Sequence, residues 1–154
     1  MLILILSFTI AILDQFTKHL IRSGMTISDM IPIIPGFFSI TYIRNTGAAW
    51  GMMSGFNGPL IALSIIMLVV LIIFRRSFIT DTLNHKIAAG LMIAGIIGNL
   101  IDRMRLGYVV DFLHFYIGKH QFPSFNVADS AICIGITIYI ISQTLEKKTF
   151  GVSP

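Results

Sequence analysis

Carboxylates placed among apolar residues are the feature of this sequence that points most directly to chemistry. Four of the seven acidic residues, Asp14, Asp102, Asp111 and Asp129, lie inside or beside strongly apolar stretches. A carboxylate at the centre of a bilayer costs roughly 2.5–3.5 kcal/mol on insertion scales, so an acid in such a segment indicates a functional site by default. These four residues are therefore the first candidates for a site.

Asp111 and Asp129 form the strongest pair, because neither has a lysine or arginine within four positions. Apolar surroundings raise the pKa of a carboxyl group, and a second carboxylate nearby leaves one group protonated while the other is ionised. Such a pair can act as general acid and general base on one water molecule. Asn126, three residues before Asp129, would share its helix face. Ion or proton conduction and purely structural polarity remain open as alternatives.

Asp14 and Asp102 have polar companions at helical spacing. Lys18 follows Asp14 by four residues, which permits an ion pair within one helix that anchors the end of that helix. Asn99, Asp102 and Arg103 form a second group, in which the aspartate and the arginine could simply neutralise each other at a helix end. Either group could instead shape a site.

The composition is that of a polytopic membrane protein. The chain has 154 residues, of which 55% are hydrophobic and 12% are charged, and the mean hydropathy is +0.87. A soluble domain carries about 25% charged residues. The net charge of +4 is spread over helix ends and loops without a basic stripe, which argues against nucleic-acid binding. The single cysteine, Cys133, lies in an apolar run and is predicted to be a buried, inert thiol.

Four windows supply the roughly 20 apolar residues that a helix needs to cross a bilayer. Between the first two lies a segment with partial alternation of apolar and polar residues, which is typical of strands. Open sheet edges are not tolerated in hydrocarbon, so this segment is expected at the membrane surface or in water. We predict one integral membrane domain over residues 1–154. Its spans cover about 1–21, 58–75, 86–104 and 126–145, and the β-like segment covers about 24–57.

Up-and-down threading of four spans brings the candidate acids to one membrane face. Asp14 lies toward the end of the first span, Asp102 at the end of the third and Asp129 at the start of the fourth. Asp111 lies in the connection between the third and fourth spans, which we expect to be a loop, and the β-like segment adds Asn45. The sequence therefore predicts one polar site near one bilayer surface.

The basic residues give a divided signal for orientation. The loop between the second and third spans and the C-terminal tail hold Arg75, Arg76, Lys86, Lys147 and Lys148, which predicts that both termini are cytoplasmic. The other six basic residues fall at the opposite face, over longer segments. They are Lys18, Arg22, Arg44, Arg103, Arg105 and Lys119.

Five segments of the sequence resemble the motifs of the bacterial lipoprotein signal peptidases (signal peptidase II). The segments occur in the family's order and are spread over nearly the whole chain, so the match is specific. One position departs slightly, because Trp50 stands where the family often has a different aromatic residue. The segments are 14–18, 44–50, 98–103, 109–112 and 125–130.

This resemblance implies an aspartic intramembrane protease with four transmembrane helices and an extracytoplasmic β-rich cradle. The two catalytic aspartates of the family match Asp111 and Asp129. The other polar positions of the family have supporting roles in shaping the site and binding substrate. They match Asp14, Lys18, Asn45, Asn99, Asp102, Arg103 and Asn126.

The resemblance also implies the substrate and the cellular location. The substrate is a prolipoprotein whose lipobox cysteine carries diacylglycerol, and the enzyme hydrolyses the peptide bond just before that cysteine. The location is the bacterial cytoplasmic (inner) membrane, with the site near its outer face. No metal or organic cofactor is implied. Membrane lipid is expected as a further partner, whereas nucleic acid is not. We expect a monomer.

A small proton- or ion-coupled transporter is the alternative from another class, because it would also carry intramembrane acids. Such a protein should place them near the middle of the bilayer or along a path across it, and it often contains an internal repeat. In this sequence the acids gather at one face, and no repeat is visible. A membrane scaffold without activity would explain the apolar spans but not the unpaired acids.

Overall fold

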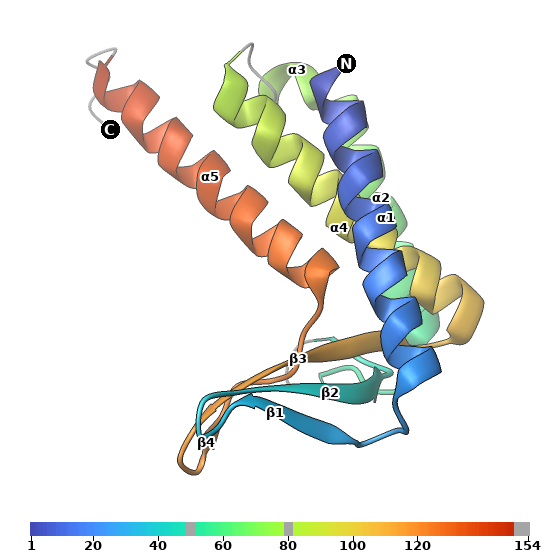
Figure 1. Cartoon of the computed structure of the whole chain (residues 1–154). Coiled ribbons are helices and arrows are strands. Elements are labelled where there is room, and N and C mark those ends of the chain that lie inside the picture. Colours follow the sequence, from blue (N-terminus) through green and yellow to red (C-terminus); the bar gives the residue numbers. More distant parts are fainter. Residues whose placement is uncertain (49–51, 79–81, 150–154) are drawn as a thin grey trace.

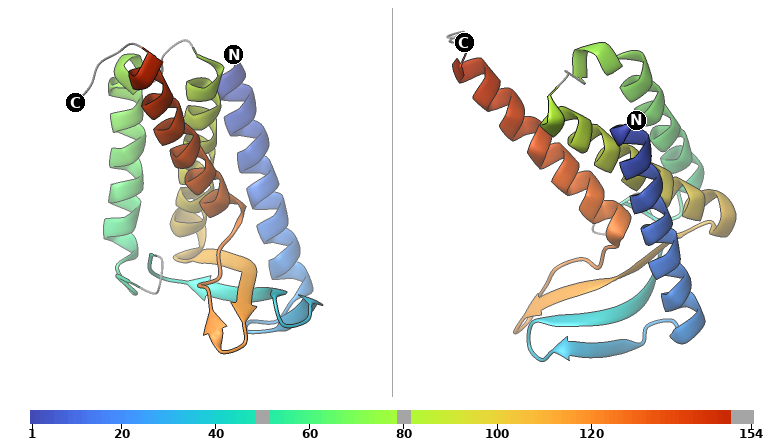
Figure 2. Two further views of the ribbon diagram at one scale, coloured as in Figure 1. Left: turned by 90° about the vertical axis from the view of Figure 1, so that its left-hand side faces the viewer. Right: turned by 45° about the horizontal axis from the view of Figure 1, so that its top comes forward.

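Four long helices stand on a small antiparallel sheet (Figure 1). The computed structural model describes residues 1–48, 52–78 and 82–149, so Trp50 lies outside the described residues. The N-terminus and the end of the last helix lie at one end of the bundle, and the sheet lies at the other (Figure 2). The long helices are α1 (Leu2–Gly24), α2 (Asn57–Ile73), α4 (Leu83–Leu106) and α5 (Val127–Thr149), and the four-residue α3 (Arg75–Phe78) follows α2.

Three of the long helices are long and apolar enough to cross a membrane. Their qualifying segments are Leu2–Gly24, Leu83–Leu106 and Val127–Glu146. The sequence predicted four spans, and the helix at the second position, α2, is apolar but has only 17 residues. A straight helix of that length is at the lower limit for the hydrocarbon core. Large apolar side chains on the outer faces of the helices are exposed, as a lipid-facing surface requires.

The sheet draws strands from two parts of the chain. Its order is β1 (Met30–Ile34), β2 (Phe38–Asn45), β3 (Val109–Ile117) and β4 (His120–Gln121), and all neighbours are antiparallel. The sequence predicted β-structure only within 24–57 and a loop around Asp111, and the second part of that prediction was wrong. Strand β3 is mostly apolar without alternation, with Asp111 and His114 as the polar exceptions, and its partner β2 is distant in sequence, so local pattern did not reveal it.

A bulge in β2 decides which face of the sheet Asn45 occupies. Ile40 pairs with Leu113 and Ile43 with Asp111, so β2 has one more residue than β3 between these pairs. Side chains alternate along a strand, and one extra residue therefore reverses the faces beyond it. Without the bulge Asn45 would lie on the face opposite Asp111. With it, both side chains lie on the same face.

Glycines let α4 approach its neighbours closely, and α4 packs against both α1 and α5. A Cβ atom on Gly95 would overlap the backbone oxygen of Ala128 and lie 2.6 Å from Cγ1 of Ile132, both on α5. A Cβ atom on Gly98 would lie 2.5 Å from the Oδ2 atom of Asp14 on α1. The two glycines therefore set the distance at which the three helices meet.

We predict that Gly95→Ala lowers the thermal unfolding temperature of the detergent-purified protein, with a loss of about 1–3 kcal/mol of stability from overpacking. Gly58→Ala is the matched control, because a Cβ atom there meets nothing within 4 Å. Equal unfolding temperatures for the two variants would show that α4 and α5 do not need this close approach.

Candidate active site

A cavity of about 750 Å³ opens where α4 and α5 meet the sheet. Asp111 and Asp129 both line it, together with Asn45 and Asn99. Its remaining walls come from the end of β2, the segment 122–125 that leads into α5, and the first turns of α5. The two candidate carboxylates therefore share one space that a substrate could enter.

Two carboxamides hold Asp111, which is 2% exposed. Asn126 donates from Nδ2 to Oδ1 of Asp111 at 2.7 Å, and Asn45 donates from Nδ2 to Oδ2 at 2.9 Å. The amide of Asn45 is itself oriented, because its Oδ1 accepts a hydrogen bond from the backbone N–H of Gly47 at 2.9 Å. Both oxygens of Asp111 are thus fixed by donors from different parts of the chain.

Asp129 is held by the first turn of its own helix and by Asn99. Asn126 precedes α5, and its Oδ1 accepts from the backbone N–H of Asp129 at 3.0 Å. In return, Oδ2 of Asp129 accepts from the backbone N–H of Asn126 at 3.2 Å, which completes a capping box. Asn99 donates from Nδ2 to Oδ1 of Asp129 at 2.7 Å. Because Asn126 contacts both aspartates, it fixes the position of one carboxyl group relative to the other.

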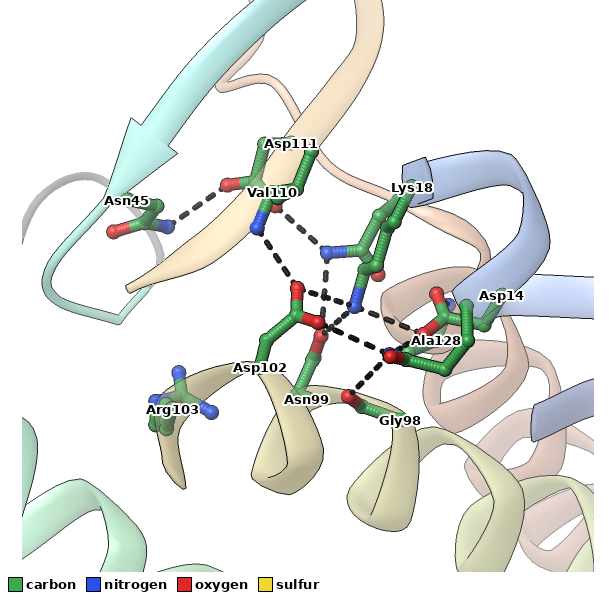
Figure 3. A network of polar contacts seen from close by, with 12 residues as sticks. Asp14, Lys18, Asn45, Gly98, Asn99, Asp102, Arg103, Val110, Asp111 and Ala128 are labelled. Carbon is green, nitrogen blue, oxygen red and sulfur yellow. Dashed lines mark hydrogen bonds and ion pairs between the residues drawn. The ribbon is translucent and has the colours of Figure 1, made fainter. Parts of the chain in front are cut away.

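A buried cluster of charges lies behind the cavity (Figure 3). The ammonium group of Lys18 is 2.9 Å from Oδ2 of Asp14, 3.2 Å from Oδ2 of Asp102 and 2.9 Å from Oδ1 of Asn99. Asp14, Lys18 and Asp102 are 0%, 2% and 3% exposed. The predicted ion pair within α1 is therefore present, and it extends to α4. None of these three residues lines the cavity.

The same cluster fixes the ends of neighbouring elements. Asp14 accepts from the backbone N–H of Ala128, at the start of α5, at 2.9 Å. Asp102 accepts from the backbone N–H of Val110, in β3, at 3.0 Å. Each contact lies next to a candidate catalytic aspartate, so the cluster positions both backbones that carry them.

Gln15 belongs to this cluster, and sequence reasoning did not select it. Its Nε2 donates to Oδ1 of Asp102 at 3.0 Å and to the backbone oxygen of Gly98 at 3.1 Å. These two partners are on α4, and a third contact, from Nε2 to Oδ2 of the neighbouring Asp14 at 3.3 Å, lies within α1. The contacts with α4 could not have been read from spacing within α1. Its place beside Asp14 in the first motif was the only available signal.

Arg103 is not an ion-pair partner of Asp102, so the structure does not support the alternative in which the two simply neutralise each other. The partners of Asp102 are Lys18, Gln15 and the Val110 N–H. Arg103 instead lines the cavity and donates to the backbone oxygen of Gly47 at 3.3 Å. Adjacent residues on a helix point about 100° apart, which is why these two have different partners.

Cys133 also differs from its prediction, because it is exposed and lines the cavity. It lies one helical turn after Asp129 and so shares a face with it. The apolar run around it faces the outside of the bundle rather than a protein core.

The surroundings of Asp111 change its acidity. Burial raises the pKa of Asp111, and the negative charge of Asp129 raises it further, to about 7. Hydrogen bonds from Asn45 and Asn126 and the positive charge of Lys18 oppose this shift only in part. Asp111 can therefore hold a proton near neutral pH and release it readily, as a general acid must.

All nine polar residues selected from the sequence lie at the sheet end of the bundle, in two connected layers. Asn45, Asn99, Arg103, Asp111 and Asp129 line the cavity, and Asn126, Asp14, Lys18 and Asp102 hold them from behind. Within residues 1–48, 52–78 and 82–149, no three His, Cys, Asp or Glu side chains are placed to bind a metal ion. The arrangement offers two carboxyl groups of unlike surroundings in a mostly apolar cavity, which suits acid–base hydrolysis by a bound water.

Comparison with known proteins gives one consistent result. Residues 6–145 match the family described as signal peptidase (SPase) II. The lipoprotein signal peptidase of Syntrophus aciditrophicus is 40% identical over 96% of this chain and 94% of its own length, and that of Staphylococcus haemolyticus is 43% identical over 95% and 92%.

Solved structures agree with these sequence matches. A bacterial membrane enzyme determined by the in meso method at 2.3 Å resolution is 38% identical, with a TM-score of 0.86 over 99% of this chain and 92% of that one. A second, determined by the same method at 1.9 Å resolution, is 40% identical, with a TM-score of 0.80 over 92% and 91%. The chain belongs to the signal peptidase II family of bacterial membrane peptidases.

Proposed function

We propose that this protein is an aspartic endopeptidase that removes the signal peptide from diacylglyceryl-modified prolipoproteins. It would hydrolyse the peptide bond before the lipidated cysteine, with Asp111 and Asp129 as the catalytic pair. The observation that carries this proposal is the cavity of about 750 Å³, which Asp111 and Asp129 both line, with Asn126 connecting the two. Membership in the signal peptidase II family supports the substrate class.

The two aspartates have unlike surroundings, which suggests separate starting roles. Asp129 lies in the first turn of α5, where the positive end of the helix dipole favours a negative charge. Asp111 has its pKa raised to about 7 by burial and by that same charge. Asp129 is therefore the candidate for the ionised general base, and Asp111 for the protonated general acid.

Hydrolysis then follows in two steps. Asp129 takes a proton from a water molecule as the water oxygen bonds to the carbonyl carbon of the scissile peptide, while Asp111 gives its proton to the carbonyl oxygen. As the tetrahedral intermediate collapses, the proton held by Asp129 passes to the leaving nitrogen and Asp111 regains its own. The carbon–nitrogen bond breaks, and both carboxyl groups return to their initial states.

The remaining polar residues would support these steps without exchanging protons. Asn45 and Asn126 orient Asp111, and Asn99 orients Asp129. Arg103 lines the cavity and lies near enough to place positive charge beside the reacting carbonyl. No metal or organic cofactor enters this scheme.

The proposed placement in the membrane follows the apolar helices. We propose four spans, with α2 crossing a locally thinned bilayer, and both termini in the cytoplasm. The cavity would then lie near the outer face of the inner membrane, where a lipid-anchored substrate can arrive by lateral diffusion. The protein would act as a monomer.

The first prediction concerns the two aspartates. Asp111→Asn and Asp129→Asn should each abolish release of the signal peptide, because an asparagine neither accepts nor donates the required proton. Both variants should remain folded, as checked by thermal unfolding. Asp29→Asn, at an exposed aspartate outside the cavity, is the matched control and should cleave normally. Full activity in either site variant would remove the catalytic pair from the proposal.

The second prediction concerns pH. Asp111 must be protonated to act as the acid, so kcat/KM, which reports the free enzyme, should fall as the pH rises past about 7, where Asp111 loses its proton. On the acidic side, kcat/KM should fall again as the base becomes protonated. The measurement is the rate of signal-peptide release by the purified protein across this range. If activity declines only at a pH far above 7, a group other than Asp111 is the general acid.

The third prediction concerns the substrate. A lipobox peptide that carries diacylglyceryl on its cysteine should be cleaved by the protein in lipid, and the same peptide without the lipid should not. Asp129→Asn provides the background rate for each peptide. If a demonstrably folded protein cleaves neither peptide, the transporter alternative gains support, and ion-flux measurements would test it.

A further inference from the structure

We propose that Lys18 is a positioning residue for the reaction, because it fixes the carboxamide of Asn99 with its NH₂ group toward Asp129. This role rests on the proposed function of the site. Lys18 itself is 2% exposed and does not line the cavity, so it contacts the catalytic pair only through other residues.

The three N–H groups of Lys18 match three acceptors. They are Oδ2 of Asp14, Oδ2 of Asp102 and Oδ1 of Asn99, at 2.9, 3.2 and 2.9 Å. An ammonium group only donates hydrogen bonds, so the group of Asn99 that faces Lys18 must be its oxygen. The two aspartates neutralise the cation, and the asparagine connects it to the cavity.

The orientation of Asn99 then decides what Asp129 meets. With Oδ1 facing Lys18, the Nδ2 group donates to Oδ1 of Asp129 at 2.7 Å, while Oδ1 also accepts from Asn126 at 3.3 Å. The reversed carboxamide would put an NH₂ group against the ammonium and a carbonyl oxygen against the carboxylate. Lys18 makes that reversal unfavourable, and burial strengthens the preference.

This arrangement keeps the proposed base ionised and correctly placed. A hydrogen bond to a charged group is roughly twice as strong as one between neutral groups, and polarisation by Lys18 strengthens the donor further. Without Lys18, Oδ1 of Asn99 would keep only its 3.3 Å contact with Asn126. The donor that α4 provides to Asp129 would then be held less firmly. The consequence would appear in the chemical step rather than in substrate binding.

A simple Lys18→Met variant would not test this role, because it leaves two buried carboxylates without their cation and destabilises the fold. Lys18→Met combined with Asp102→Asn reduces the problem to one carboxylate, Asp14, which keeps the backbone N–H of Ala128 and the amide of Gln15 as donors. The wild-type cluster has two carboxylates and one ammonium, a net charge of −1, and the double variant has one carboxylate, also −1. Asp102→Asn alone retains the contact between Lys18 and Asn99 and is the reference.

We expect the double variant to lower kcat roughly ten- to a hundredfold relative to Asp102→Asn, as loss of a hydrogen bond to a charged group implies, with little change in KM. The decline of kcat on the acidic side (the acid limb of the pH profile) should occur at a higher pH than in Asp102→Asn. Lys18→Gln with Asp102→Asn restores an N–H donor and should recover part of the loss. A role confined to folding would instead lower the unfolding temperature and leave the pH profile unmoved.

Asn99→Ala is the second test, and it leaves the charge cluster intact. It should reproduce the lower kcat and the displaced acid limb. In the Asp102→Asn background, adding Lys18→Met to Asn99→Ala should cause no further loss. If the losses in kcat from the two sets of substitutions multiply, or if the acidic decline of kcat stays at its wild-type pH, Lys18 does not have this role. The proposed function is unaffected by that result as long as the wild type cleaves the substrate. A folded wild type that cleaves no lipidated peptide would overturn the proposed function and this role with it.

Discussion

The buried ammonium group of Lys18 is the constraint on which the site depends. A buried cation is stable only when it is paired and fully hydrogen-bonded, and here the partners come from α1 and α4. The two aspartates that pair with it also accept from the backbone N–H groups of Ala128 and Val110. One charge therefore joins two helices to the start of α5 and to β3, each next to an aspartate that lines the cavity.

The sheet supplies the other half of the site, and the bulge in β2 is its decisive feature. The face that carries Asp111 also carries Ile40, Ile43 and Leu113, and it meets the helices at the cavity. A single extra residue in β2 brings Asn45 to that face. Close packing at Gly95 and Gly98 then fixes α4 against both neighbours. The bulge in β2 and the two glycines take no part in the chemistry, but they set the shape of the cavity.

Much of this could be predicted from sequence because the unusual residues were acids in apolar surroundings. Asp111 and Asp129 stood out without any knowledge of the fold, since a carboxylate is costly in such segments. The helices at all four predicted spans followed from apolar runs of sufficient length. Strand β3 could not be predicted, because its pairing with β2 depends on residues far away in the chain. Gln15 was missed for the same reason, as its contacts with Gly98 and Asp102 lie on another helix.

Basic residues occur at both ends of the bundle, and the structure explains part of this distribution. Of the six basic residues at the sheet end, Lys18 is neutralised by two aspartates and Arg103 lines the cavity beside two more. The positive-inside rule concerns basic residues that meet the lipid surface, and residues held within the protein do not inform it. Arg44 donates to the hydroxyl of Tyr42 and lies 4.8 Å from the centre of the Tyr108 ring, but it is exposed and still counts. The basic residues that remain at the sheet end are Arg22, Arg44, Arg105 and Lys119, so the two ends of the bundle differ by only one basic residue.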